Sequence, residues 1–181
     1  MSYLYKTGLI VGRFQMLHNG HKQIVEQALE LCRTVVVFIG SSQEALTKNN
    51  PFSYYVRKQM FEKVFATEVA TKRLIIKSLP DIGVGNNDIW GRYVLGRFEA
   101  AFNKLPDIYI SGCEKVRSTW FNNDIAPTTD ELRITRTHIN VSATQCRELV
   151  ANGDFETCRQ YIPEELYDDF EFYQKIIKES K

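Results

Sequence analysis

The sequence predicts an α/β fold: a Rossmann-like parallel sheet of about five strands, with helices on both faces and a helical C-terminus. Short apolar runs alternate with longer amphipathic segments along most of the chain. The run at 34–39 (TVVVFI) is apolar and β-branched throughout, which is typical of a strand buried on both faces. Beyond residue 141 only helical patterns follow. This alternation indicates parallel strands joined by crossover helices.

The expected elements follow in order along the chain. Strands are predicted at 9–11, 34–39, 74–76, 107–111 and 132–137. Helices are predicted at 23–32, 53–66, 88–102, 142–151, shortly after 154, and from 163 to about 178. Ser53 and Asp88 are candidate N-caps, Gly153 is a candidate C-terminal stop, and Pro163 suits a first helical position.

Four loops follow predicted strands, at 12–21, 40–52, 80–90 and 111–116. The carboxyl ends of parallel strands meet at one edge of a sheet, and ligands bind at that edge. We therefore expect distant segments of the chain to build a single site.

Length and composition limit the possible functions. The 181 residues suit a single domain, 1–181, with a Rossmann-like core at about 1–140 and C-terminal helices at about 141–181. The chain has 23 basic and 22 acidic residues, so its net charge is close to zero. A broad surface that binds nucleic acid or membrane is therefore not expected. No apolar run approaches the ~20 residues of a bilayer span, and the N-terminus does not read as a signal peptide. Four scattered cysteines without a CxxC pair predict reduced thiols in the cytoplasm.

The most informative motif is GRFQMLHNGHK at 12–22, between the first predicted strand and helix. It places His18 and His21 three residues apart. Unpaired N–H groups and the helix dipole make such a helix N-terminus an anion site. Gly20 would let a phosphate approach the backbone closely, and both imidazoles would donate to the same anion. The motif predicts a site that holds a nucleoside triphosphate for attack.

A second motif, INVSATQCR at 139–147, also precedes a helix. Ser142 followed by Gln145 forms a capping-box pattern. Alone, this pattern describes a capped surface helix with a solvated arginine. Beside the first motif it predicts a second phosphate cradle, with Ser142 and Thr144 on the first turn and Arg147 one turn later.

The two motifs resemble the HxGH and ISxTxxR signatures of the nucleotidyltransferase superfamily, with Val141 in the isoleucine place. The resemblance implies transfer of AMP or CMP onto an acceptor, with His18, His21 and Arg147 as catalytic residues. The implied ATP-binding residues are Gly12, Arg13, Phe14, Gln15, His18, Gly20, His21, Lys22, Ser142, Thr144 and Arg147. A phosphate acceptor is already anionic, so the site would act by positioning and by neutralising charge, with Lys22 and Arg147 at the leaving pyrophosphate. Mg²⁺ would be held by ATP oxygens and water, without a protein ligand.

The middle of the chain resembles the archaeal-type nicotinamide-nucleotide adenylyltransferases in segments 38–43 and 50–53, Arg57, and an NxxW element at 87–90. The similarity runs from residue 8 to about 165 and implies the reaction NMN + ATP → NAD + pyrophosphate. The implied NMN-binding residues are Ser41, Lys48, Phe52, Asp81, Ile82, Asn87 and Trp90. Trp90 would face the nicotinamide ring, and Asp81 would repel the carboxylate of nicotinate mononucleotide. The alternatives are that Trp90 is a residue of the core and that Asp81 is only a turn residue.

Three departures from the family pattern leave the acceptor open. Met16 replaces the usual proline, Lys48 and Asn49 stand near the usual arginine, and the loop at 81–87 is about two residues longer than is typical. One alternative is an adenylyl- or cytidylyltransferase for another phosphorylated acceptor, and a second is a nucleotide-sensing module without turnover. A third alternative is the catalytic core of an aminoacyl-tRNA synthetase. The short length of the chain and the lack of a KMSKS-like loop argue against it.

The resemblance also implies a homo-oligomer and a preference for ATP as the nucleotide. Four aromatic residues of the last helix would serve either an interface or the protein's own core: Tyr167, Phe170, Phe172 and Tyr173.

Overall fold

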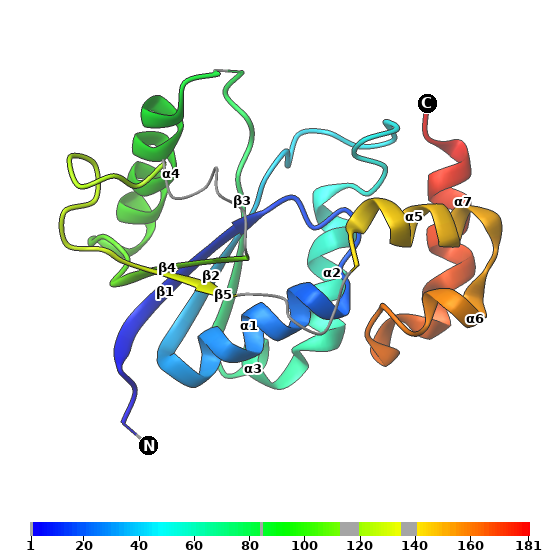
Figure 1. Cartoon of the computed structure of the whole chain (residues 1–181), viewed down its shortest axis with the longest axis horizontal. Helices are drawn as coiled ribbons and strands as arrows, with labels where there is room; N and C mark the ends of the chain where they lie inside the picture. Colours follow the sequence, from blue (N-terminus) through cyan, green and yellow to red (C-terminus); the bar gives the residue numbers. More distant parts are fainter. Residues whose placement is uncertain (1, 84, 113–119, 135–140) are drawn as a thin grey trace.

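The computed structural model describes residues 2–83, 85–112, 120–134 and 141–181. At its centre is a parallel sheet with the strand order β3-β2-β1-β4-β5 (Figure 1). The strands are β1 (Tyr5–Gly12), β2 (Cys32–Ile39), β3 (Leu74–Ser78), β4 (Ile108–Gly112) and β5 (Asp130–Ile134). The predicted fifth strand begins two residues earlier than expected, and its last residues, 135–137, lie outside the described ranges.

Helices cover both faces of this sheet. They are α1 (Asn19–Leu31), α2 (Tyr54–Val64), α3 (Ala66–Ala70), α4 (Asn87–Phe102), α5 (Ala143–Asn152), α6 (Phe155–Cys158), the 3₁₀ helix η2 (Glu164–Asp169) and α7 (Phe170–Glu179). In Figure 1, α1 and α2 lie on one face, α4 lies on the other, and α5 to α7 gather beyond one end. Strand side chains alternate accordingly: Ile10 and Val37 pack toward α1, while Leu9 and Val36 pack toward α4. The predicted fold class is confirmed.

Two of the four predictions of helix ends are confirmed. Ser53 caps α2, and Gly153 ends α5 in the left-handed conformation at φ 74°. The expectation for Asp88 is wrong, because α4 begins one residue earlier and Asn86 caps it instead. Pro163 stands just before η2, so it is not the first helical residue there.

The C-terminal helices share one apolar core with the sheet. Val150, Cys158 and Leu166 pack in the same cluster as the α1 face of the strands. Phe170 and Tyr173 are buried in this cluster, whereas Phe172 is 49% exposed. Two of the four C-terminal aromatic residues therefore build the protein's own core. Within the described ranges, no helix has both the length and the apolar character that a membrane crossing requires.

Candidate active site

The first motif forms a strand, a tight loop and a helix start, as predicted. β1 ends at Gly12, and His18 is the N-cap of α1 with an extended backbone (φ −136°, ψ 169°). The rings of His18 and His21 stack, with centroids 3.7 Å apart and planes inclined by 25°. His18 is buried and His21 is half-buried. The structure therefore places both imidazoles side by side at the N-terminus of α1.

Phe14 supports this pair from the side of the core. Its ring is 5% exposed and meets the ring of His21 edge-on, at 4.9 Å between centroids. The same ring meets Phe61 of α2 at 4.9 Å. A Cβ atom on Gly12 would lie 2.8 Å from the Phe14 ring, so a larger residue there would displace that ring. The sequence predicts that Phe14 binds ATP, and the structure shows its ring buried against His21 and Phe61.

Gln15 ties this loop to the loop that follows β2. Its Nε2 donates to the Phe52 carbonyl and its Oε1 accepts from the Phe52 amide, both at 2.9 Å. Phe52 is fully buried, and its ring lies 5.6 Å from that of Tyr173. The side chains of Gln15 and Phe52 are therefore buried in contacts that join the loop after β1 to the loop after β2.

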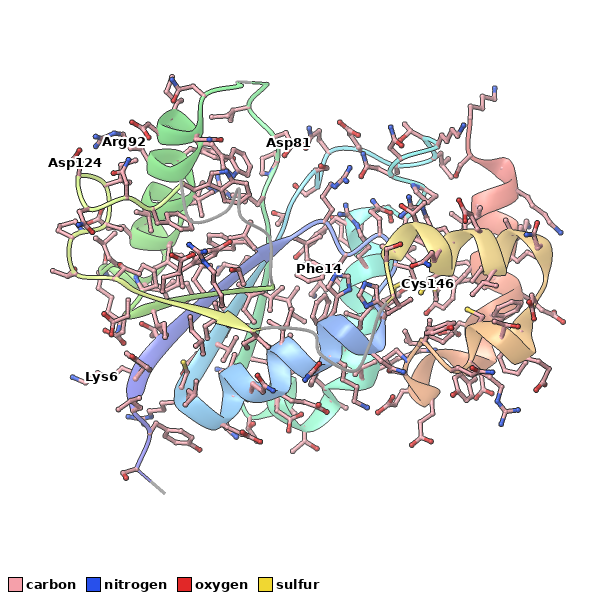
Figure 2. The ribbon with its side chains drawn as sticks, in the orientation of Figure 1. Lys6, Phe14, Asp81, Arg92, Asp124 and Cys146 are labelled. Carbon is pink, nitrogen blue, oxygen red and sulfur yellow. The ribbon has the colours of Figure 1, made fainter. Side chains whose placement is uncertain are left out.

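The second motif folds as a capped helix that reaches the first motif. Ser142 Oγ accepts from the backbone N–H of Gln145 at 3.2 Å, and Gln145 Oε1 accepts from the backbone N–H of Ser142 at 2.9 Å. The predicted capping box is confirmed. Arg147 donates through Nη1 to the Gln15 carbonyl and through Nη2 to Thr144 Oγ1, 3.3 Å away. The two motifs, 132 residues apart at this contact, thus meet. Figure 2 shows Phe14 close to the start of α5, which carries Cys146.

The junction of the two motifs is electropositive. Burial lowers the pKa of Arg147, and the nearby Arg13 cation lowers it further. Arg13 is exposed at the carboxyl end of β1. Two neighbouring cations disfavour each other unless an anion lies close to both, so this junction suits a phosphate group.

A cavity of about 550 Å³ opens at the carboxyl ends of β1 and β2. Seven residues predicted from the sequence line it: Gly12, Arg13, Ser41, Asp81, Ile82, Asn87 and Trp90. Residues not predicted also line it: Val11, Gly40, Gly83, Gly85, Asn86 and Trp120. Figure 2 shows Asp81 on the loop that leads from β3 toward α4. Of the fourth predicted loop, residues 113–116 lie outside the described ranges.

Asp81 is held in place by the loop after β2. Ser41 Oγ donates to Asp81 Oδ2 at 2.6 Å, and the Ser41 amide lies 3.4 Å from Oδ1. The Asp81 amide donates to Gln43 Oε1 at 3.0 Å. Ser41 adopts a left-handed backbone (φ 47°), which is unfavourable for a residue other than glycine. These contacts fix a carboxylate at the cavity wall, which goes beyond the role of a turn residue.

Two tryptophans form the aromatic part of the cavity wall. The ring of Trp90 lies 5.8 Å from that of Trp120 at 79°, and 5.5 Å from that of Tyr93. A Cβ atom on Gly91 would lie 1.8 Å from the Trp120 carbonyl oxygen. The backbone of α4 is therefore in direct contact with the backbone at Trp120. Trp90 therefore both packs against α4 neighbours and lines the cavity. Sequence reasoning missed Trp120; its one signal is an aromatic pair, Trp120–Phe121, shortly after a predicted strand.

The structure does not bring two predicted lysines to the cavity. Lys22 Nζ pairs with Glu165 Oε1 at 3.0 Å and lines a separate groove with Glu26 and Arg73. Lys48 is exposed, and its amide donates to the Lys181 carbonyl at 2.8 Å. Neither ammonium group lines the cavity as the chain stands.

Comparison with known proteins identifies the family. The profile described as Cytidylyltransferase-like matches residues 9–149, which include both motifs. This chain belongs to the cytidylyltransferase-like family. It is 35% identical over 135 residues to the nicotinamide-nucleotide adenylyltransferase of Thermococcus kodakarensis, covering 70% of this chain and 71% of that protein. It is 30% identical over 172 residues to the enzyme of the same name from Aeropyrum pernix, covering 88% and 91%.

The predicted relationship to the archaeal nicotinamide-nucleotide adenylyltransferases is thus confirmed, and the protein is a nucleotidyltransferase. Solved structures share its fold. A bifunctional NMN adenylyltransferase/ADP ribose pyrophosphatase from Francisella tularensis, complexed with AMP and a manganese ion, superposes with a TM-score of 0.72 at 23% identity. That alignment covers 96% of this chain and 52% of the longer one. The Plasmodium falciparum nicotinic acid mononucleotide adenylyltransferase gives 0.64 at 12% identity, covering 96% and 98%.

Proposed function

We propose that the protein transfers AMP from ATP to NMN and releases NAD and pyrophosphate. The observation that carries the proposal is the contact of Arg147 with the Gln15 carbonyl. This contact joins the second motif to the His18 loop beside the cavity that Asp81 and Trp90 line. The names of the archaeal relatives support NMN as the acceptor.

In the proposed reaction, ATP lies across the N-termini of α1 and α5. An oxygen of the acceptor phosphate attacks the α-phosphorus, and the bond from that phosphorus to the oxygen bridging to the β-phosphate breaks. Pyrophosphate leaves with the electron pair. His18 and His21 donate to phosphate oxygens, while Arg13 and Arg147 neutralise charge that grows on the leaving group. The protein acts mainly by positioning two anions against each other.

On the acceptor side, the nicotinamide ring would lie against the aromatic wall of Trp90 and Trp120. A pyridinium cation over an aromatic face gains roughly 0.5–2 kcal/mol. The carboxylate of Asp81 would favour the uncharged carboxamide of NMN over the carboxylate of nicotinate mononucleotide.

The donor set suits a divalent cation only as a companion of ATP. Among the described residues, no group of three or more His, Cys, Asp or Glu side chains is arranged to hold a metal ion. The cavity offers guanidinium, hydroxyl and amide groups and one carboxylate. Mg²⁺ would be held by phosphate oxygens of ATP and water, where it supplies further charge neutralisation. Our proposal also includes one domain over 1–181, a homo-oligomer, and a cytoplasmic location.

The first test is pyrophosphate release with ATP and Mg²⁺ and a panel of acceptors: NMN, nicotinate mononucleotide, phosphopantetheine, FMN and none. We expect rapid release with NMN and a product with the mass of NAD. His21→Ala should lower kcat/KM by about 10²–10³-fold, the effect of losing one preorganised donor. Lys175→Ala, at an exposed position of α7, is the control and should match the wild type.

Each outcome separates the candidate functions. Turnover with a different acceptor would retain the mechanism and replace the substrate. Tight binding of ATP or NAD without pyrophosphate release in the presence of any acceptor would contradict the proposed enzymatic activity and favour a nucleotide sensor.

A further inference from the structure

We propose that Arg57 is a positioning residue that sets the separation of the ATP-binding and acceptor-binding loops and adds buried positive charge beneath the phosphates. The inference rests on the proposed function, because that function assigns a substrate to each loop. Arg57 itself is not among the described residues that line the cavity.

The guanidinium of Arg57 links the loops that follow β1 and β2 to the N-terminus of α2, at the carboxyl edge of the sheet. The side chain extends from α2 and is fully buried. Its hydrogen-bond partners among the described residues are backbone carbonyl oxygens. They are those of Arg13 at 2.6 Å and Gly40 at 2.7 Å from Nη1, Ser41 at 3.1 Å from Nη2, and Ser53 at 3.2 Å from Nε. One rigid, planar group thus fixes the ends of β1 and β2 relative to each other and to α2.

The position is electrostatically unfavourable for a cation with only a structural role. Burial lowers the pKa of Arg57 to about 10, and the opposing effect of the Asp81 carboxylate is smaller. The group also lies at the N-terminus of α2, beside its N-cap Ser53, where the helix dipole disfavours positive charge. The carbonyl oxygens satisfy its hydrogen bonds but leave its net charge in place. An anion bound at the adjoining loops would offset this cost.

Both ends of the linkage reach residues to which the proposed function assigns a substrate. Arg13, whose carbonyl accepts from Arg57, lines the cavity and acts electrostatically on Arg147. Ser41, whose carbonyl also accepts from Arg57, holds Asp81 through its hydroxyl. A displaced guanidinium would therefore move the phosphate side and the acceptor side together.

Kinetics of Arg57→Lys test the positioning role, because lysine keeps the charge and loses the planar fork. We expect the KM values for ATP and NMN each to rise by about 10-fold and kcat to fall by about 10²-fold. The matched control is Met60→Ala, which removes a fully buried side chain from the same helix. It should lower the unfolding temperature and leave both KM values unchanged. An Arg57→Lys enzyme that loses stability in the same way but keeps both KM values would overturn the proposal.

The pH profile tests the role of the charge. The charged and titratable groups that act on Arg57 are Arg13, Glu44, Asp81 and Tyr54. A lysine in this buried place has a lowered pKa, so the variant loses its cation as the pH rises from 7 toward 10. Its kcat/KM relative to the wild type should fall over that range. A ratio that does not change with pH would show that the charge has no part in binding.

Calorimetric titration with ATP alone separates this proposal from the choice of acceptor. Arg57→Lys should weaken ATP binding by about 10-fold relative to both the wild type and Met60→Ala. Equal ATP affinity in all three proteins would overturn the role of Arg57, whether or not the wild type makes NAD. Weakened ATP binding in a protein that makes no NAD would instead remove NMN as acceptor and keep Arg57 as the residue that orders the ATP loop.

Discussion

Asp81 is the side chain that we expect to set the preference between the two acceptors. Its carboxylate stands at the cavity wall, held by the hydroxyl of Ser41. The side chain is exposed, so solvent weakens its action on a second charge, yet two carboxylates brought close together still repel.

We therefore predict that Asp81→Asn raises the use of nicotinate mononucleotide relative to NMN by about 5-fold in kcat/KM, on the scale of two charges interacting near water. Asparagine keeps the oxygen that accepts from Ser41, so the loop should retain its shape. Parallel assays with the two acceptors measure the ratio. Asp124→Asn, an exposed substitution on another loop, controls for the loss of net charge. An unchanged ratio would mean that Asp81 does not face the base.

At this scale, the sequence predicted side chains well where one local motif defines them, and poorly where a distant partner does. His18 and His21 stack at the start of one helix, which their spacing of three anticipated. Lys22 is compatible by spacing with the same site, but Glu165, 143 residues away, holds it elsewhere. Phe52 is similar: its burial depends on Gln15 and Tyr173, and no local pattern reveals either contact.

Among the elements, α4 forms one wall of the cavity, with Asn87 and Trp90. It packs its backbone directly against the Trp120 segment at Gly91. A methyl group added to Gly96 of the same helix would have no atom of another described segment within 4 Å. The two glycines therefore provide a matched pair within one helix.

We predict opposite results for Gly91→Ala and Gly96→Ala. The first should destabilise the protein by about 1–3 kcal/mol through overpacking and raise the KM for NMN. The second should stabilise it by about 0.5–1 kcal/mol, because alanine is the better helix former. Chemical denaturation and acceptor kinetics measure both. Equal stability of the two variants would contradict the close contact at Trp120.

Element types were easier to predict than element ends. The β-branched run of β2 and the capping box of α5 each act within a few residues, so the sequence alone revealed them. Asn86, Asn87 and Asp88 are all good capping residues, and only the packing of α4 selects the first of them.

For the whole molecule, one apolar core joins the sheet to the C-terminal helices, and three cysteines lie inside it: Cys32, Cys146 and Cys158. Burial raises the pKa of Cys146 to about 12 and those of Cys32 and Cys158 to about 11. Thiolate is the reactive form, so these thiols are protected while the core is intact.

We predict that iodoacetamide at pH 8.5 labels these three cysteines only as fast as the whole protein unfolds, in a Cys113→Ser background. Because their folded pKa values are raised, their contribution to stability is complete below about pH 8.5 and is lost as the pH rises toward 11–12. Mass spectrometry of labelled peptides across urea concentrations measures the rates. Fast labelling of Cys146 or Cys158 in native buffer would show that the C-terminal helices open independently.

The place of β1 in the middle of the sheet has a consequence for biosynthesis. The residues of β1 leave the ribosome before those of one of its neighbours, β4, which pairs with it 100 positions later, Gly8 against Ile108. At about 5–20 residues per second, that edge of β1 waits roughly 5–20 s for its partner. Arg147 emerges later still, so a nascent chain has the histidine loop well before it has the second motif. The proposed ATP site, which needs both motifs, is therefore complete only after Arg147 has emerged, whereas a chaperone can cover the apolar edge of β1 before then.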